Sequence, residues 1–199
     1  MQGAKARRLI GLINRTFSLT ESKLSIFKTH VRPLLEYCTV VFSNMRQIDR
    51  FAIENVQRRF TKQLLGYSSP LNYMERCEIL HLEPLWLRRL RMNLSFFCNI
   101  VKRTSCNSAP QVKTPSNYSL RHRDSMVLIP VSRTAMRSNF FIVKYSSLWN
   151  KLPPQLRSMS SASLLFKKEI NKHLTVQKLI RMHDPYMSIT RAYELGLGY

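Results

Sequence analysis

The segment QIDRFAIENVQRRFTKQLLG, residues 47–66, carries the clearest structural signal in the chain. Its apolar residues recur every four positions along one side, and its charged residues do the same along the opposite side. The apolar set is Ile48, Ala52, Val56, Phe60 and Leu64, and the charged set is Arg50, Glu54, Arg58 and Lys62. This pattern predicts a helix with one packed side and one wet side, on which Glu54 pairs with the arginines one turn away. Gly66 is expected to end it.

Helical patterns also precede this segment. Ser18 and Glu21 have the spacing of a capping box, and an apolar stripe follows them as far as Cys38. Pro33 interrupts the stripe and predicts a kink or a break, because proline lacks a backbone donor and clashes with the preceding turn.

Further helices are expected downstream. Residues 71–80 predict a short helix, and Glu83-Pro84 begin a longer one with a heptad-spaced apolar seam over residues 87–101. Alternation in residues 126–131 predicts a short strand, which Pro130 would place at a sheet edge. Helices over residues 138–150 and from about Ser163 complete the pattern. The expected fold is mainly α, divided into a helical region (1–102), a polar linker (103–118), a small α+β region (119–175) and a tail (176–199).

The charge distribution indicates a polyanionic partner. The chain has a formal net charge of +21, with 44% hydrophobic and 10% aromatic residues. Between Pro84 and Lys168 the only carboxylate is Asp124, against fifteen Lys and Arg residues. A compact fold with this imbalance repels itself unless a polyanion supplies counter-charge. RNA or DNA is therefore the expected partner.

The patterns that support catalysis or metal binding are missing. The three aspartates Asp49, Asp124 and Asp184 are scattered singly, so no adjacent pair could hold two divalent metals. The four cysteines form no CxxC, and none of the five histidines has metal-ligand spacing. We expect no enzymatic activity, cofactor or small-molecule ligand. No apolar run approaches the roughly 20 residues of a membrane span, so the expected location is intracellular, nuclear or cytoplasmic, without secretion.

Three groups of cations are the candidate phosphate contacts, which would bind backbone without reading sequence. They are Arg50, Arg58 and Lys62; Arg88, Arg89 and Arg91; and Lys167, Lys168 and Lys172. The first group could instead be a solvated face that Glu54 partly neutralises, and the last could be solubilising charge. The second group has no nearby acid after Glu83 in the sequence. Trp149 and Tyr37 could stack on bases, but their apolar surroundings favour core packing.

Several stretches resemble reverse transcriptases of non-LTR retrotransposons, especially jockey-like elements. FKTHVRPLLEY at residues 27–37 is similar to the family's YKTYIRPILEY, which lies downstream of the catalytic core. ENVQRRFT at 54–61, YMER at 73–76 and LHLEPLWLRR at 80–89 follow in the family's order. The closing RT, FF, LWNKLP and FK occur at 133–134, 140–141, 148–153 and 166–167. The resemblance covers roughly residues 5–174.

This resemblance implies the helical thumb and the segment after it, which hold the template-primer duplex beside the palm. Fingers, palm and the YADD-type loop have no counterpart here, Phe42 stands where Trp is commoner, and the 103–118 linker is not a family feature. The chain is therefore expected to be a non-catalytic C-terminal fragment, with the fingers and palm as further partners. Such a fragment predicts an exposed apolar seam at residues 87–101.

Two alternatives remain open at this point. One is a free-standing basic nucleic-acid-binding protein derived from a retroelement. The other is a mitochondrial RNA-associated protein, because the first twenty residues are rich in arginine and hold no acid. The same residues serve equally well as a first helix with a buried side.

Overall fold

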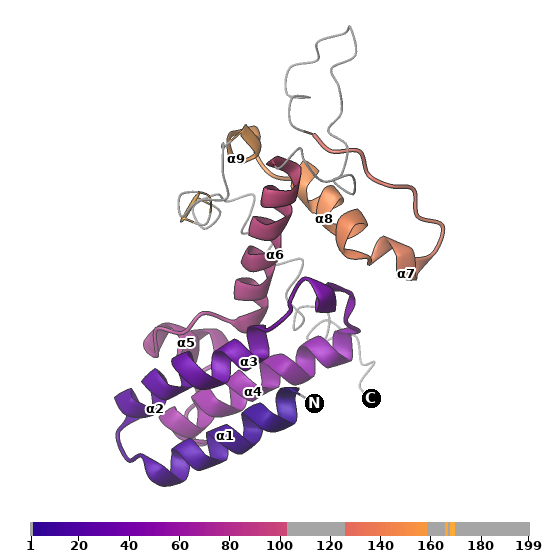
Figure 1. Cartoon of the computed structure of the whole chain (residues 1–199). Coiled ribbons are helices and arrows are strands. Elements are labelled where there is room, and N and C mark those ends of the chain that lie inside the picture. The colour runs from indigo at the N-terminus through magenta and orange to yellow at the C-terminus, as the bar shows by residue number, and fades with distance from the viewer. Residues whose placement is uncertain (1, 103–125, 159–165, 167, 170–199) are drawn as a thin grey trace, which may run out of the picture. The chain divides into compact units, whose positions relative to one another are not determined.

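A computed structural model describes residues 2–102, 126–158, 166, 168 and 169. The described residues are mainly α-helical, as expected, and contain no β-strand (Figure 1). They belong to two compact units. The first unit contains described residues 2–38 and 45–89, and the second contains residues 39–44, 90–102 and those from 126 onward.

The first unit is a layer of short helices around α4. Its elements are α1 (Gln2–Thr16), α2 (Thr20–Ile26), the π-helical turn η1 (Phe27–Val31), α3 (Arg32–Glu36), α4 (Gln47–Leu65), α5 (Tyr73–Ile79) and the first residues of α6 (Leu85–Lys102). Its core joins α1 to α4: Ala6, Ile10 and Ile13 are buried beside Phe27, which stacks on Phe60 with ring centroids 4.2 Å apart.

The kink expected at Pro33 takes the form of the π-helical turn. The backbone N–H of Arg32 donates to the carbonyl of Phe27, five residues back, where an α-helix would use the fourth. Proline lacks a backbone donor and its ring crowds the preceding turn, so the chain widens there and continues as α3. The predicted capping box is wrong: α2 begins after Leu19, and no side chain caps it.

The two-sided pattern predicted for α4 is also wrong in part. Ile48 is 73% exposed and Ala52 is exposed, whereas Glu54 from the supposedly wet side is only 1% exposed. The reason is geometric: each four-residue step turns the helix about 40° beyond a full circle, so a strict series drifts across the surface. The buried side instead carries Val56 and Phe60 together with polar side chains. Gly66 does end the helix, with a φ of 91°.

The two helices predicted within residues 71–102 are confirmed. α5 spans Tyr73–Ile79 and begins with a capping box, in which Asn72 and Glu75 bond each other's backbone N–H groups at 3.0 and 2.8 Å. α6 begins directly after the Glu83-Pro84 step. The helix boundaries thus follow local signals in this part of the chain.

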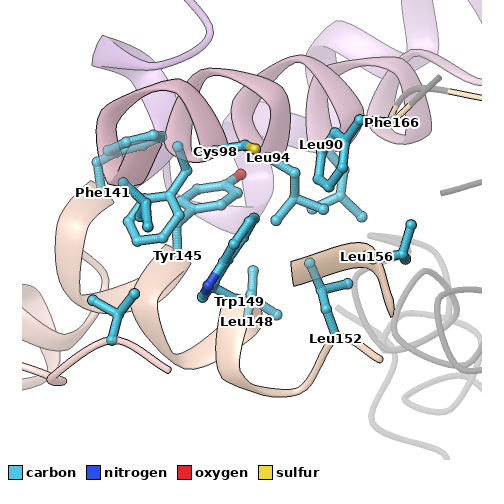
Figure 2. Close-up of a cluster of buried hydrophobic side chains, with 13 residues drawn as sticks. Leu90, Leu94, Cys98, Phe141, Tyr145, Leu148, Trp149, Leu152, Leu156 and Phe166 are labelled. Carbon is cyan, nitrogen blue, oxygen red and sulfur yellow. The ribbon is translucent and has the colours of Figure 1, made fainter. Parts of the chain in front are cut away.

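The second unit is built around the apolar side of α6. Its other elements are the 3₁₀ turn η2 (Val41–Asn44), α7 (Ala135–Ser138), α8 (Phe141–Asn150) and α9 (Pro154–Ser158). Trp149 of α8 lies at the centre of the core and is fully buried (Figure 2). The expected exposed seam on α6 is wrong, because this core covers it. The buried seam residues are Leu90, Leu94, Phe97 and Val101, and Leu87 is half-buried.

No strand forms over residues 126–131: Val127 alone is a bridge residue, and a side chain bonds both of its backbone groups. The backbone N–H of Val127 donates to Oδ1 of Asn150 and its carbonyl accepts from Nδ2, both at 2.9 Å. The helix predicted over 138–150 is interrupted at Asn139 and Phe140, between α7 and α8. The 103–118 linker, the start of the helix expected near Ser163 and the 176–199 tail lie outside the described residues.

Candidate nucleic-acid interface

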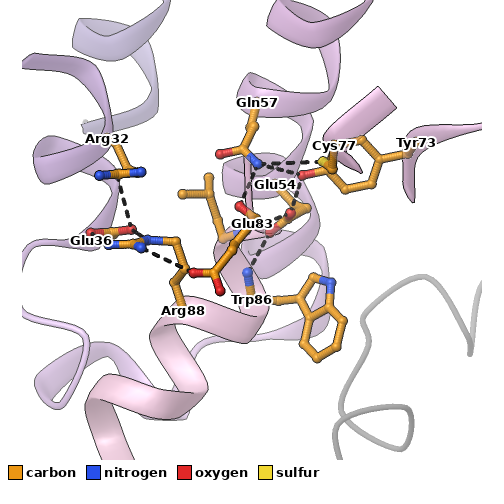
Figure 3. Close-up of polar contacts among 10 residues, drawn as sticks. Arg32, Glu36, Glu54, Gln57, Tyr73, Cys77, Glu83, Trp86 and Arg88 are labelled. Carbon is orange, nitrogen blue, oxygen red and sulfur yellow. Dashed lines mark hydrogen bonds and ion pairs between the residues drawn. The ribbon is translucent and has the colours of Figure 1, made fainter. Parts of the chain in front are cut away.

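A buried carboxylate fixes the start of α6, the helix that carries Arg88, Arg89 and Arg91. Glu54 of α4 accepts hydrogen bonds from the backbone N–H groups of Leu85 at 3.0 Å and Trp86 at 2.8 Å (Figure 3). Tyr73 Oη donates to the same carboxylate at 2.5 Å. Glu54 therefore caps α6 from a neighbouring helix, and it satisfies two backbone donors that a helix N-terminus leaves unpaired.

Gln57, one turn further along α4, extends this polar cluster. Its Nε2 donates to Tyr73 Oη at 3.1 Å and to the carbonyl of Glu83 at 2.9 Å, and it also lies 3.9 Å from Cys77 Sγ. Burial raises the pKa of the Tyr73 hydroxyl, and the nearby Glu54 carboxylate raises it further. Burial also raises the pKa of the Cys77 thiol to about 11. The thiol is therefore protonated at neutral pH and is a packing group here.

Arg88 is paired with carboxylates inside the first unit. Its Nε and Nη2 donate to both oxygens of Glu36, the latter at 3.3 Å, and its Nη1 lies 3.2 Å from Glu83 Oε2 (Figure 3). The hydrogen bond with Glu36 raises the pKa of the Arg88 guanidinium above its usual value. Sequence reasoning found no acid after Glu83 and missed Glu36, which lies 52 residues earlier. Arg88 stays a predicted contact, but its charge is already balanced locally.

The neighbouring predicted contacts are partly buried. Arg50 donates from Nε to the carbonyl of Met45 at 3.1 Å, and Nη2 of Arg89 lies 3.7 Å from the sulfur of the same methionine. Arg91 and Arg58 are half-buried. Of the three α4 cations predicted as phosphate contacts, only Lys62 is exposed. The α4 and α6 predictions therefore remain open, with Lys62 the most accessible to a phosphate.

The remaining predicted residues differ in their surroundings. Lys168 is exposed, and Lys167 and Lys172 lie outside the described residues. Core packing is confirmed for Trp149, which is fully buried and cannot stack on a base. Core packing is wrong for Tyr37, which is 64% exposed immediately before Cys38, a residue with a φ of 52°.

Several exposed cations escaped the sequence prediction. They are Lys5, Arg7, Arg8 and Arg15 on α1, Arg46 and Arg59 at α4, and Arg133, Arg137 and Lys151 in the second unit. The signal was available for α1, because residues 2–16 hold four cations and no acid. In the sequence these cations also fit a targeting segment, whereas in the structure α1 supplies buried residues to the first core.

No protein-family model, curated protein or solved structure matches this chain. Within residues 2–102 and the described positions beyond 125, no group of three or more His, Cys, Asp or Glu side chains could hold a metal ion. In the same part of the chain, no helix combines the length and apolar character that a membrane span requires.

Proposed function

We propose that this chain binds the phosphate backbone of nucleic acid, as the thumb and post-thumb region of a non-LTR retrotransposon reverse transcriptase does, and that it performs no catalysis itself. Its partners would be RNA, DNA or a template-primer duplex, together with the fingers and palm of such an enzyme. Its place of action would be the nucleus or cytoplasm.

The uneven distribution of charge is the observation that carries this proposal. Among its described residues, the second unit has eight Lys or Arg residues and a single carboxylate, Glu169. The first unit has fifteen Lys or Arg residues and seven carboxylates, of which Glu36 and Glu54 are buried. Both units therefore present excess positive charge, and a polyanion provides the counter-charge that they lack.

The positions of the motif residues support the family resemblance. In ENVQRRFT, Arg58 is half-buried and Arg59 is exposed, whereas most of the other side chains are buried. The buried ones are Glu54, Val56, Gln57, Phe60 and Thr61. In LWNKLP, Trp149 fills the second core and Asn150 bonds both backbone groups of Val127. Several residues that match the family therefore pack inside this fold, which supports the proposed relationship.

A second candidate is a free-standing basic nucleic-acid-binding protein. The covered seam on α6 favours it, because Leu90, Leu94 and Phe97 find their packing partners within this chain. The two candidates differ in their behaviour as purified material. A monodisperse, folded chain in analytical ultracentrifugation supports the free-standing protein, and aggregation relieved by added fingers and palm supports dependence on the rest of the enzyme.

The mitochondrial alternative has less support. Cleavage near Thr20 would remove Ala6, Ile10 and Ile13 from the first core, which would leave Phe27 and Phe60 facing a void. A chain that begins at residue 20 should therefore unfold at a lower temperature than the full chain. An equal melting temperature would return this alternative to consideration.

Competition binding tests the proposed function. A fluorescent 20-base-pair RNA–DNA hybrid is bound at low ionic strength and displaced by unlabelled duplexes of unrelated sequence. We expect equal displacement by all sequences, because phosphate contacts carry no sequence information. A parallel primer-extension reaction with Mg²⁺ and nucleotides should yield no product. Failure to bind the hybrid, or extension of the primer, contradicts the proposal.

A further inference from the structure

The outward side of α1 is a row of cations on a firmly packed helix. Lys5, Arg8 and Arg15 are exposed, and they lie within about 80° of one another around the helix axis. We call these three residues the α1 basic face. The opposite side carries Ala6 and Ile10, which are buried in the first core. The face is therefore the surface that remains after the helix has packed.

The charge of the α1 basic face is not balanced within the described part of the chain. No carboxylate occurs in Gln2–Thr16, and no described carboxylate forms an ion pair with these three cations. Arg15 donates from Nε to the carbonyl of Gly11 at 3.2 Å. This bond holds the guanidinium along its own helix and involves no carboxylate. Arg88, in contrast, has two carboxylate partners.

Tertiary contacts hold this helix in place. Asn14 Nδ2 donates to Gln63 Oε1 of α4 at 2.8 Å, and Ile13 is buried on the same side. A ligand that contacts the α1 basic face would not have to order the backbone, which lowers the entropic cost of binding. A rigid row of cations differs in this respect from a solubilising tail.

We infer that the α1 basic face is a contact surface for the phosphate backbone of a nucleic-acid duplex. This inference rests on the proposed function and adds a site to it, because none of the three residues belongs to the groups predicted from sequence. Lys5 and Arg15 are ten residues apart, which places them about 15 Å apart along the axis. A duplex carries one negative charge per about 1.7 Å of its axis, so several phosphates lie within that length.

The composition of the α1 basic face favours a duplex over a single strand. Proteins that bind single strands without sequence preference combine cations with aromatic side chains on which bases stack. The exposed side chain between Arg8 and Arg15 is Leu12, at 54% exposure, and α1 contains no aromatic residue. The α1 basic face therefore provides positive charge for a phosphate backbone but no aromatic ring on which an unpaired base could stack.

Two triple variants of the full chain test this inference. One carries Lys5→Gln, Arg8→Gln and Arg15→Gln, and the matched control carries Arg133→Gln, Arg137→Gln and Lys151→Gln. Both remove three exposed cations. The Kd for a 20-base-pair duplex is measured by fluorescence anisotropy over a series of KCl concentrations, and thermal melting monitored by circular dichroism verifies that each variant is folded.

The α1 variant is expected to reduce the log–log salt slope by about 2.7, since each lost phosphate contact contributes about 0.9. The control should reduce it by less. A slope change in the α1 variant that is no larger than in the control overturns the inference and leaves the proposed function intact. Tighter binding of the unmodified chain to a single strand of equal length than to the duplex also overturns it.

Absence of any binding by the unmodified chain contradicts the proposed function itself. If the triple variant does not fold, Arg8→Gln alone should lower the slope by about 0.9, and an unchanged slope then counts against the inference.

Discussion

Replacing Glu54 with Gln should destabilise the first unit strongly, although sequence alone places this residue on a wet helix face. The carboxylate accepts from Tyr73 Oη and Leu85 N through Oε1, and from Trp86 N through Oε2. Glutamine has nearly the same size, so the substitution removes an acceptor without opening a cavity. Its amide group can accept at one oxygen only, and its NH₂ group would face a backbone or hydroxyl donor.

The expected cost follows from these three bonds. One buried donor, such as the N–H of Trp86, loses its acceptor, which costs about 1–3 kcal/mol. The two remaining bonds lose the assistance of a charged acceptor, about 1 kcal/mol each, and the neutral amide recovers part of this because a buried charge is removed. The net loss in the free energy of unfolding should be about 2–4 kcal/mol.

Urea titration followed by tryptophan fluorescence measures this loss. The chain has two tryptophans, so a Trp149→Phe background leaves Trp86, next to the Glu54 carboxylate, as the reporter of the first unit. Glu78→Gln is the control, because Glu78 is exposed on the adjacent helix α5, and its effect should stay within about 0.5 kcal/mol. A Glu54→Gln chain as stable as this control would refute the role assigned to the carboxylate.

Other consequences of the structure can be checked by unfolding measurements. Gly11→Ala should raise the free energy of unfolding by about 0.5–1 kcal/mol, because a Cβ there meets nothing within 4 Å, and a lower melting temperature would contradict this. Gly66→Ala should lower it by about 1–2 kcal/mol, since alanine is strained at a φ of 91° even with open space around it, so a neutral effect counts against that backbone geometry. Burial raises the pKa of Cys77 from 9.0 to about 11, so the folded state retains this proton longer than the unfolded state. The stabilisation from the protonated thiol is complete below pH 9 and is lost as the pH rises to about 11, so the urea midpoint of unfolding should fall over this range. Cys77→Ala should make that fall shallower. An equally steep fall in the variant would be inconsistent with the raised pKa of Cys77. Asn150→Ala should cost about 2–3 kcal/mol by leaving both backbone groups of Val127 without partners, and an unchanged melting temperature of the second unit would show that these bonds are dispensable.

Much of the helical architecture could be predicted from local sequence. Gly66 ends α4 because only a residue without Cβ adopts its positive φ easily, and the Glu83-Pro84 step precedes α6 because proline fixes φ just before the first turn. These signals act within a few residues. They therefore remain valid whatever the tertiary arrangement.

The sequence could not show which polar residues lie inside. Glu54 follows the same four-residue series as Arg50, and only the arrival of Tyr73 and the start of α6 makes its position buried. Asn150 likewise bonds both backbone groups of Val127 from 23 residues away, whereas the alternation near Val127 indicated a strand, and none is present among the described residues. Hydrogen bonds between residues so far apart in the chain leave no periodic pattern in the sequence.

The candidate interface was only partly predictable for the same reason. Net charge indicated a polyanion, but it could not show that Glu36 neutralises Arg88 or that Arg8 of α1 is unpaired within the described chain. Exposure and local pairing decide which cations are accessible, and both depend on tertiary structure. The accessible cations therefore overlap only in part with those that clustering in the sequence singled out, of which Lys62 and Lys168 are exposed.

The salt dependence of duplex binding by the unmodified chain tests the central claim most directly. The logarithm of the association constant for a 20-base-pair duplex should fall linearly with the logarithm of KCl concentration, with a slope steeper than about −2.7, the value for three phosphate contacts. An affinity that is independent of salt, or no binding at 20 mM KCl, roughly the lowest ionic strength at which such titrations are run, would contradict binding through the phosphate backbone.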